Sequence, residues 1–118
     1  MQDFKNIEVW KKAHKLVIDI YQNTVSFPSS ELYGITSQIR RASVSTPTNI
    51  AEGSAKGSNA DFCRYLQIAF GSASEVEYLL LLSFELKYIN EEYTVLLNQI
   101  IEVKKMLSGF IKKLKAVN

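Results

Sequence analysis

Histidine and cysteine are almost absent from this sequence of 118 residues, which contains only His14 and Cys63. A lone cysteine excludes a disulfide within the chain and a cysteine-based zinc site within one subunit. The di-iron sites of helical bundles need a Glu-x-x-His motif on each of two helices, which one histidine cannot supply. We expect His14 to lie at the edge of the core with a hydrogen-bonded ring. Since there is no glycine-rich phosphate loop either, the sequence predicts a protein that is not an enzyme and holds no metal or other cofactor.

Glycine and proline are also scarce, with five and two residues. A sheet protein of this length would need more turn residues, so their scarcity favours helices. Long apolar runs are missing as well: the longest covers residues 78–82, far short of the ~20 residues that span a bilayer. The first six residues lack the apolar stretch of a signal peptide. We therefore expect a cytoplasmic protein with no membrane partner.

The composition itself is that of an ordinary globular protein, with 47% hydrophobic and 22% charged residues. The length suits a single domain over residues 1–118, built around one core. Fourteen basic and twelve acidic residues give a net charge of +2, which neither requires nor excludes a polyanionic partner. What decides the matter is whether the positive charge gathers on one face.

Four stretches have helical periodicity, over residues 6–26, 31–53, 58–88 and from 90 onward. In the first stretch, a stripe runs through Ile7, Trp10, His14, Val17, Tyr21 and Thr24. Ala13, Leu16 and Ile20 lie beside this stripe and widen it. The last stretch has the clearest pattern, an a/d heptad seam through Tyr93, Leu96, Ile100, Val103, Leu107, Phe110 and Leu114.

Pro47 lies inside the second stretch, and the apolar periodicity continues beyond it through Ile50 and Ala51. A proline removes one backbone donor and crowds the preceding turn, so we prefer one kinked helix to the alternative of two helices. Four amphipathic helices with short connections then predict an all-α fold. We expect an antiparallel up-down-up-down four-helix bundle whose second helix is kinked at Pro47.

The second stretch is also unusually polar around this proline. Its polar residues recur every three or four positions and can share a face; they include Gln38, Arg41, Asn49 and Glu52. One interpretation is a solvated surface with an ordinary ion pair, such as Arg41 with Glu52. The other is a buried or interfacial hydrogen-bond network of Arg41, Asn49 and Glu52. Under that second interpretation the candidate structural or interface residues are Gln38, Arg41, Pro47, Asn49, Glu52 and Gly53.

Several motifs in this chain carry a family resemblance. Residues 38–53 read QIRRASVSTPTNIAEG, residues 9–13 read VWKKA, residues 27–34 read FPSSELYG and residues 62–72 read FCRYLQIAFGS. Together they resemble the signature of four-helix-bundle proteins encoded in bacterial 23S rRNA intervening sequences. They are equally similar to the related accessory variability determinant (Avd) proteins of diversity-generating retroelements. Thr46 stands where isoleucine is usual in the motif.

The resemblance implies an antiparallel bundle that assembles into a ring of five subunits. It also implies a role in binding structured RNA or another nucleic acid. In the retroelement branch, the implied partners are a reverse transcriptase and its template RNA, and the sequence does not distinguish the two branches.

Basic residues are compatible with such a role. They cluster in several stretches, and the candidates for nucleic-acid contact are Lys11, Lys12, Lys15, Arg40, Lys56, Lys112, Lys113 and Lys115. Five copies in a ring would turn a weak patch into a strong one through multivalency. Two alternatives stay open. In the first, the lysines are simply solvated helix faces. In the second, the protein is an oligomeric scaffold that binds a protein partner such as a reverse transcriptase without touching nucleic acid.

Overall fold

The chain forms four α-helices joined by short connections. The computed structural model describes residues 3–117, and the helices are α1 (Glu8–Asn23), α2 (Ile35–Ser54), α3 (Asn59–Glu85) and α4 (Glu92–Ala116). Two short 3₁₀ helices, η1 (Phe4–Asn6) and η2 (Ser29–Glu31), precede α1 and α2. No strand occurs within residues 3–117. This confirms the predicted all-α four-helix bundle.

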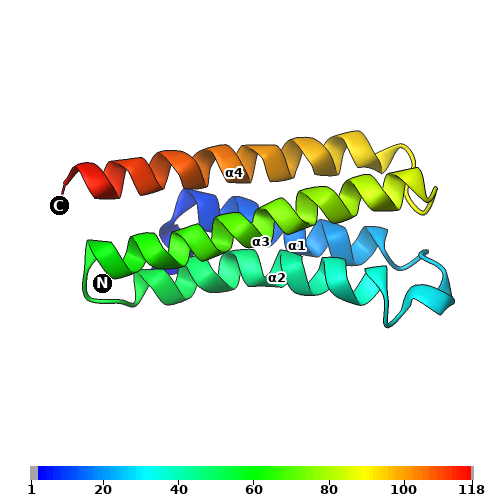
Figure 1. Ribbon diagram of the computed structural model, residues 1–118, viewed down its shortest axis with the longest axis horizontal. Helices are drawn as coiled ribbons and strands as arrows, with labels where there is room; N and C mark the ends of the chain where they lie inside the picture. Colours follow the sequence, from blue (N-terminus) through cyan, green and yellow to red (C-terminus); the bar gives the residue numbers. More distant parts are fainter. Residues whose placement is uncertain (1–2, 118) are drawn as a thin grey trace.

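Successive helices run antiparallel along a body of 46 × 22 × 20 Å (Figure 1). Helix α1 packs against α2 and α4, and α3 packs against the same two helices, which closes the bundle. No helix in the described range has the length and apolar content needed to cross a membrane. Helix α4 continues past the start of α1, so its last turns lie beside α3 (Figure 1).

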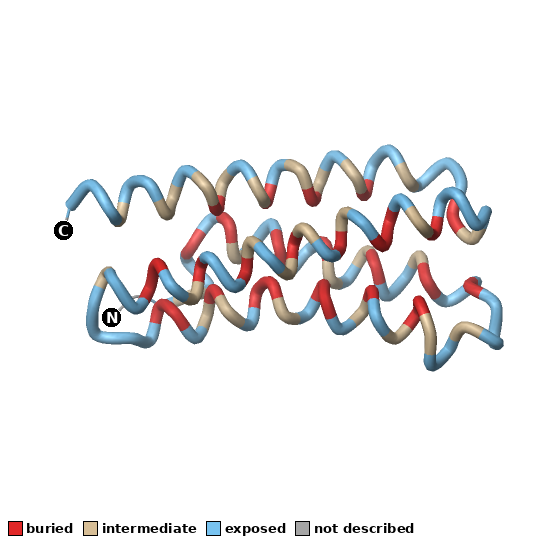
Figure 2. Tube along the Cα trace, in the orientation of Figure 1, coloured by how far each residue is buried: buried red, intermediate tan, exposed pale blue. Residues whose placement is uncertain are grey.

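The core follows the seam predicted for α4. Leu96, Ile100, Val103 and Leu107 are buried, whereas Phe110 and Leu114, in the last turns, are only partly buried. Figure 2 shows the buried positions of the four helices converging on the middle of the bundle and thinning out toward the end of α4. The predicted seam is therefore buried from Leu96 to Leu107 and only partly buried at its two ends.

The buried face of α1 is shifted by about one residue from the stripe that the sequence predicted. The buried residues of the helix are Val9, Ala13, Leu16 and Ile20, whereas His14 and Tyr21 are exposed. His14 makes no hydrogen bond with the described residues. Its ring instead stacks on that of Trp10, at a centroid distance of 4.9 Å. The expectation of a hydrogen-bonded histidine at the core edge is therefore wrong.

Helix α2 begins later than predicted because the chain before it turns as η2. There the Glu31 carboxylate accepts a hydrogen bond from the backbone N–H of Ile35 (3.2 Å) and another from the Tyr88 hydroxyl (2.9 Å). From Ile35 the helix continues unbroken to Ser54 with Pro47 inside it, as one helix rather than two.

Gly53 lets α2 and α3 approach closely beside their connecting turn. A Cβ atom built on this residue would lie 2.8 Å from Cδ1 of Phe62 and 2.8 Å from Cβ of Tyr65. Both distances are shorter than real Cβ contacts, so only glycine fits without a shift of α3. Ser58 then caps α3 by accepting a hydrogen bond from the backbone N–H of Asp61 (3.1 Å).

Candidate nucleic-acid interface

The charged residues are distributed unevenly along the bundle. The midpoints of the helices divide the chain into two halves, which meet where Ser45 of α2 hydrogen-bonds Ser72 of α3 (2.8 Å). One half comprises residues 3–15, 45–72 and 105–117, and holds the α2–α3 turn and the C-terminal end of α4 (Figure 1). The other half comprises residues 16–44 and 73–103.

The first half, called here the basic half, contains ten basic and four acidic residues, a net charge of +6. The other, the acidic half, contains three basic and eight acidic residues, a net charge of −5. Lys104, the middle residue of α4, belongs to neither and completes the overall +2. The macrodipoles of antiparallel helices largely offset one another, so the asymmetry comes from the side chains. A nearly neutral chain is thus strongly polar along its axis.

The three lysines of α1 lie in the basic half, but each is paired with an acid. Lys11 is 3.2 Å from Glu8, Lys12 is 3.5 Å from Glu102, and Lys15 is 2.7 Å from Asp19. Their charge is therefore partly neutralised within the chain.

Asp19 also accepts a hydrogen bond from the side-chain amide of Gln99 in α4 (2.9 Å). Partial burial alone would raise the pKa of the Asp19 carboxyl. The hydrogen bonds from Lys15 and Gln99, together with the charge of Lys15, nevertheless hold its pKa below its ordinary value. The Lys15–Asp19–Gln99 cluster thus joins α1 to α4 at the middle of the bundle.

The candidates Arg40 and Lys56 lie in different halves of the bundle. Arg40 lies in the acidic half, where its Nε donates to the Thr24 hydroxyl (2.9 Å) and its guanidinium lies 4.7 Å from the centroid of the Tyr21 ring. Arg40 therefore ties α2 to α1 away from the other candidates. Lys56 lies in the basic half, with its ammonium 5.1 Å from the centroid of the Tyr65 ring.

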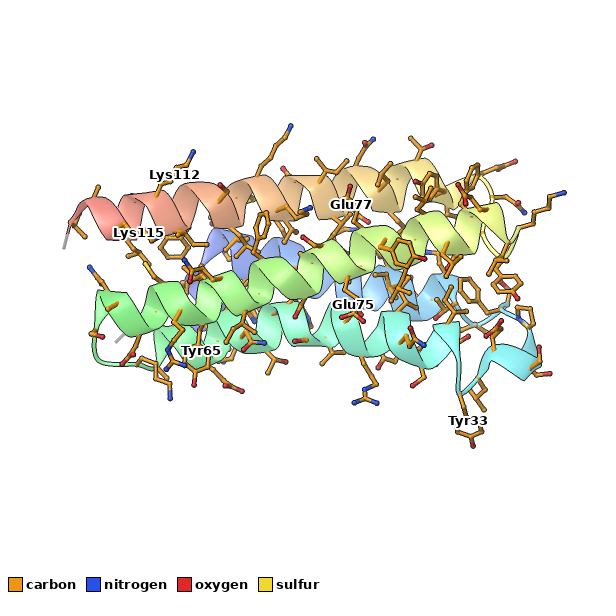
Figure 3. The ribbon with its side chains drawn as sticks, viewed as in Figure 1. Tyr33, Tyr65, Glu75, Glu77, Lys112 and Lys115 are labelled. Carbon is orange, nitrogen blue, oxygen red and sulfur yellow. The ribbon has the colours of Figure 1, made fainter. Side chains whose placement is uncertain are left out.

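The lysines in the second half of α4 are the most available cations. Lys105, Lys112, Lys113 and Lys115 are exposed, and none makes an ion pair or side-chain hydrogen bond with another residue in the range 3–117. Figure 3 places Lys112 and Lys115 at the same end of the bundle as Tyr65, far from Tyr33 at the opposite end. Of the eight sequence-predicted candidates, Lys112, Lys113 and Lys115 thus form the free cluster, and Lys105 joins them.

A groove runs between α3 and α4 beside these lysines. It consists of two adjoining hollows of about 300 and 410 Å³ that share Phe70 and Ser108. The first hollow is completed by Gln67, Ile111, Lys112 and Lys115, and the second by Glu77, Ile101, Lys104 and Lys105. We call this feature the α3–α4 groove. Nothing in the sequence marks Phe70 or Gln67 as a site residue, because Phe70 fits the helical pattern as an ordinary core residue.

A separate, more apolar hollow of about 380 Å³ lies on another side of the bundle, between α1 and α2. Its walls include Trp10, His14, Val17, Val44 and Pro47. Glu52 also lines it, so two of the candidate structural residues, Pro47 and Glu52, border this α1–α2 groove.

The polar network predicted near Pro47 does not form within the chain. Arg41 and Glu52 are exposed and make no hydrogen bond or ion pair with any described residue. Asn49 donates instead to the backbone oxygen (2.9 Å) and the hydroxyl (3.1 Å) of Ser45, whose hydroxyl meets that of Ser72. The prediction of a buried Arg41–Asn49–Glu52 network within one subunit is therefore wrong, because Arg41 and Glu52 point outward from α2. An interfacial network stays a prediction, as does an interface role for Gln38, which is also exposed.

Comparison with known proteins finds a matching family and similar solved structures. The sequence profile of the family described as 23S rRNA-intervening sequence protein matches residues 5–109. A solved structure is also similar, that of a protein with unknown function from the S23 ribosomal protein family of Bacteroides thetaiotaomicron VPI-5482. The two chains are 32% identical with a TM-score of 0.79, over 88% of this chain and 98% of that one. No functionally curated protein matches.

Proposed function

The chain belongs to the 23S rRNA-intervening sequence protein family, and on that premise we propose that it is a non-enzymatic, ring-forming bundle that binds structured RNA or another nucleic acid. The observation that carries the proposal is the charge asymmetry, +6 against −5, with four lysines of α4 on the basic half that pair with no residue in the range 3–117. The site of action is the cytoplasm.

Electrostatics makes the basic half a natural contact for a phosphate backbone. Attraction to a polyanion acts over a Debye length of about 10 Å, which is short against the 46 Å length of the bundle, so acids at the far end of the acidic half are largely screened from a contact at the basic end. The contact is with phosphates rather than with bases of defined sequence, because no base-reading motif is present. Four phosphate contacts imply a loss of affinity of about 10²-fold between ~50 and ~200 mM salt.

Assembly would multiply this weak patch. Apolar residues remain exposed on the outer surface, including Ile68, Tyr78 and Leu81 of α3, and surplus apolar surface of this kind usually marks an interface. The number of five subunits rests on the family resemblance. A ring of five would carry about 20 of the free α4 lysines, and simultaneous contacts would raise the avidity.

The alternative is a scaffold that binds a protein partner such as a reverse transcriptase, without direct contact to nucleic acid. The observation that favours it is the apolar α1–α2 groove, whose walls include Trp10 and Pro47. Binding through that groove would persist at high salt, because burial of apolar surface does not depend on counterions.

Two triple variants with the same change of charge separate the free lysines from the paired ones. Lys105→Gln/Lys112→Gln/Lys115→Gln removes free lysines of α4, and Lys11→Gln/Lys12→Gln/Lys15→Gln removes the paired lysines of α1. The intact oligomer is titrated against structured RNA, single-stranded DNA and duplex DNA by filter binding. We expect the α4 variant to lose at least 10-fold more affinity than the α1 variant, at ~50 mM salt. If the wild-type oligomer, confirmed intact by light scattering, binds none of the three, the scaffold is the better explanation.

A further inference from the structure

The first hollow of the α3–α4 groove combines features that a phosphate backbone alone does not require. Phe70 and Ile111 provide an apolar floor, Gln67 and Ser108 provide polar groups, and Lys112 and Lys115 provide cations. Its volume of about 300 Å³ is at the lower end of the range for small-molecule sites. We infer, resting on the proposed function, that this hollow seats an unpaired nucleotide of a single-stranded or looped nucleic acid.

The apolar floor suits a base. Phe70 is half-buried, so its ring is held in place by the core while one part of it borders the hollow. The Lys104 ammonium lies 5.1 Å from the centroid of this ring, but Lys104 lines only the second hollow. Among residues 3–117, no cation lies over Phe70 within the first hollow itself, where the ring is offered to a base, and aromatic side chains stack on bases with little regard to sequence.

The polar side chains of this hollow are free to form hydrogen bonds with the edge of such a base. Within the described part of the chain, neither Gln67 nor Ser108 uses its side chain in a hydrogen bond. An amide can both donate and accept, and so can a hydroxyl. These two groups can therefore satisfy different base edges, which fits a tolerant site better than a sequence-specific one.

The cations sit where the phosphate of the same nucleotide would lie. Lys112 and Lys115 are three residues apart on α4 and share one face. None of the residues that line this hollow is acidic. The one acid of the groove, Glu77, lies in the second hollow and is bound to Lys104 at 2.8 Å. Apolar floor, polar wall and cationic rim thus match base and phosphate together.

A duplex cannot use the hollow in this way, since its bases are stacked inside and only its backbone is accessible to these lysines. The inference therefore predicts a preference for unpaired nucleotides, which phosphate contacts alone would not produce. It identifies the kind of nucleic acid that the proposed function leaves open.

The test compares two Phe→Leu variants of α3 in the full-length oligomer. Phe70→Leu keeps an apolar side chain on the core but removes the stacking ring. Phe84→Leu is the matched control, because Phe84 lies in the acidic half, where it stacks on Tyr93 at 4.4 Å. The probes are a short single-stranded RNA and the duplex that it forms with its complement, at ~50 mM salt.

We expect Phe70→Leu to weaken binding of the single strand about 10-fold while leaving duplex binding within about 2-fold, and Phe84→Leu to change neither. Lys112→Gln/Lys115→Gln should weaken both. If Phe70→Leu leaves the ratio of single-strand to duplex affinity unchanged while the lysine variant weakens both, this inference fails and the proposed function stands. If the wild type binds neither probe, the proposed function itself fails.

A second variant covers the case in which Phe70→Leu does not fold, as judged by circular dichroism and oligomer mass. Ser108→Leu fills the same hollow from the α4 side without touching the core position of Phe70. It should produce the same selective loss of single-strand binding. Unchanged single-strand binding by a folded Ser108→Leu variant would overturn the inference.

Discussion

Replacing Gly53 by alanine should destabilise the bundle, although alanine is the better helix former. The added Cβ would lie 2.8 Å from both Cδ1 of Phe62 and Cβ of Tyr65. The Phe62 ring can rotate slightly, but Cβ of Tyr65 is fixed to the backbone of α3. Helix α3 must therefore move away from α2 where the two helices join.

Two opposing terms set the size of the effect. Overpacking of this kind costs about 1–3 kcal/mol, while alanine gains up to about 1 kcal/mol over glycine through helix propensity. The net result is a destabilisation of about 1 kcal/mol, or a fall in Tm of about 4 °C for a chain of this size. Gly109→Ala is the matched control, because its added Cβ has no described atom within 4 Å apart from its chain neighbours and the backbone of its own stretch of helix. There only propensity acts, so we expect a stabilisation of about 0.5–1 kcal/mol.

Urea unfolding followed by circular dichroism gives the free energy of unfolding for both variants. The measurements must share one protein concentration, since association contributes to apparent stability. Opposite signs for Gly53→Ala and Gly109→Ala are the expected result. A Gly53→Ala protein as stable as the wild type or more so would refute the close approach of α2 and α3.

Two further predictions concern charged residues on α1 and α2. Since the fold holds the pKa of Asp19 below its ordinary value of 3.8, its contribution to stability is present above that pH and is lost as pH falls through the lower, folded-state pKa. The stability difference between wild type and Asp19→Asn, measured by thermal melts, should therefore be larger at pH 7 than at pH 2. A difference that does not depend on pH would show that Lys15 and Gln99 do not stabilise the Asp19 carboxylate. Arg41→Ala should change the free energy of unfolding of a dissociated subunit by no more than about 0.5 kcal/mol, because Arg41 is exposed. If Arg41 lies at an interface, the same variant should have a lower oligomer mass in light scattering, and an unchanged mass would remove Arg41 from the predicted interface.

The helical periods of the sequence were enough to predict the bundle. In α4 the heptad pattern marks a narrow seam, and Leu96, Ile100, Val103 and Leu107 are buried as that pattern requires. Helix α1 is apolar over a wider arc, so neighbouring stripes through Trp10 or through Leu16 fit the same period. Packing against α2 and α4 selects the stripe with Leu16, a choice that the period of one helix cannot make.

The candidate site was less predictable, because availability of a lysine depends on partners far away in the sequence. The pairs Lys11–Glu8 and Lys15–Asp19 have helical spacing and could be read from the sequence. The pair Lys12–Glu102 joins residues of different helices, and only the fold brings them together. The charge asymmetry likewise emerges only after the antiparallel order has placed the α2–α3 turn beside the end of α4.

The most direct test of nucleic-acid binding through α4 is the salt dependence of affinity for one structured RNA, compared between wild type and Lys105→Gln/Lys112→Gln/Lys115→Gln. Each phosphate contact contributes about 0.7–0.9 to the slope of log K against log salt concentration. If the three lysines contact phosphates, the slope of the variant should be shallower than that of the wild type by about 2–3 for each subunit that touches the RNA. Equal slopes in two intact oligomers would contradict the account, since the α4 lysines would then contribute nothing to the contact.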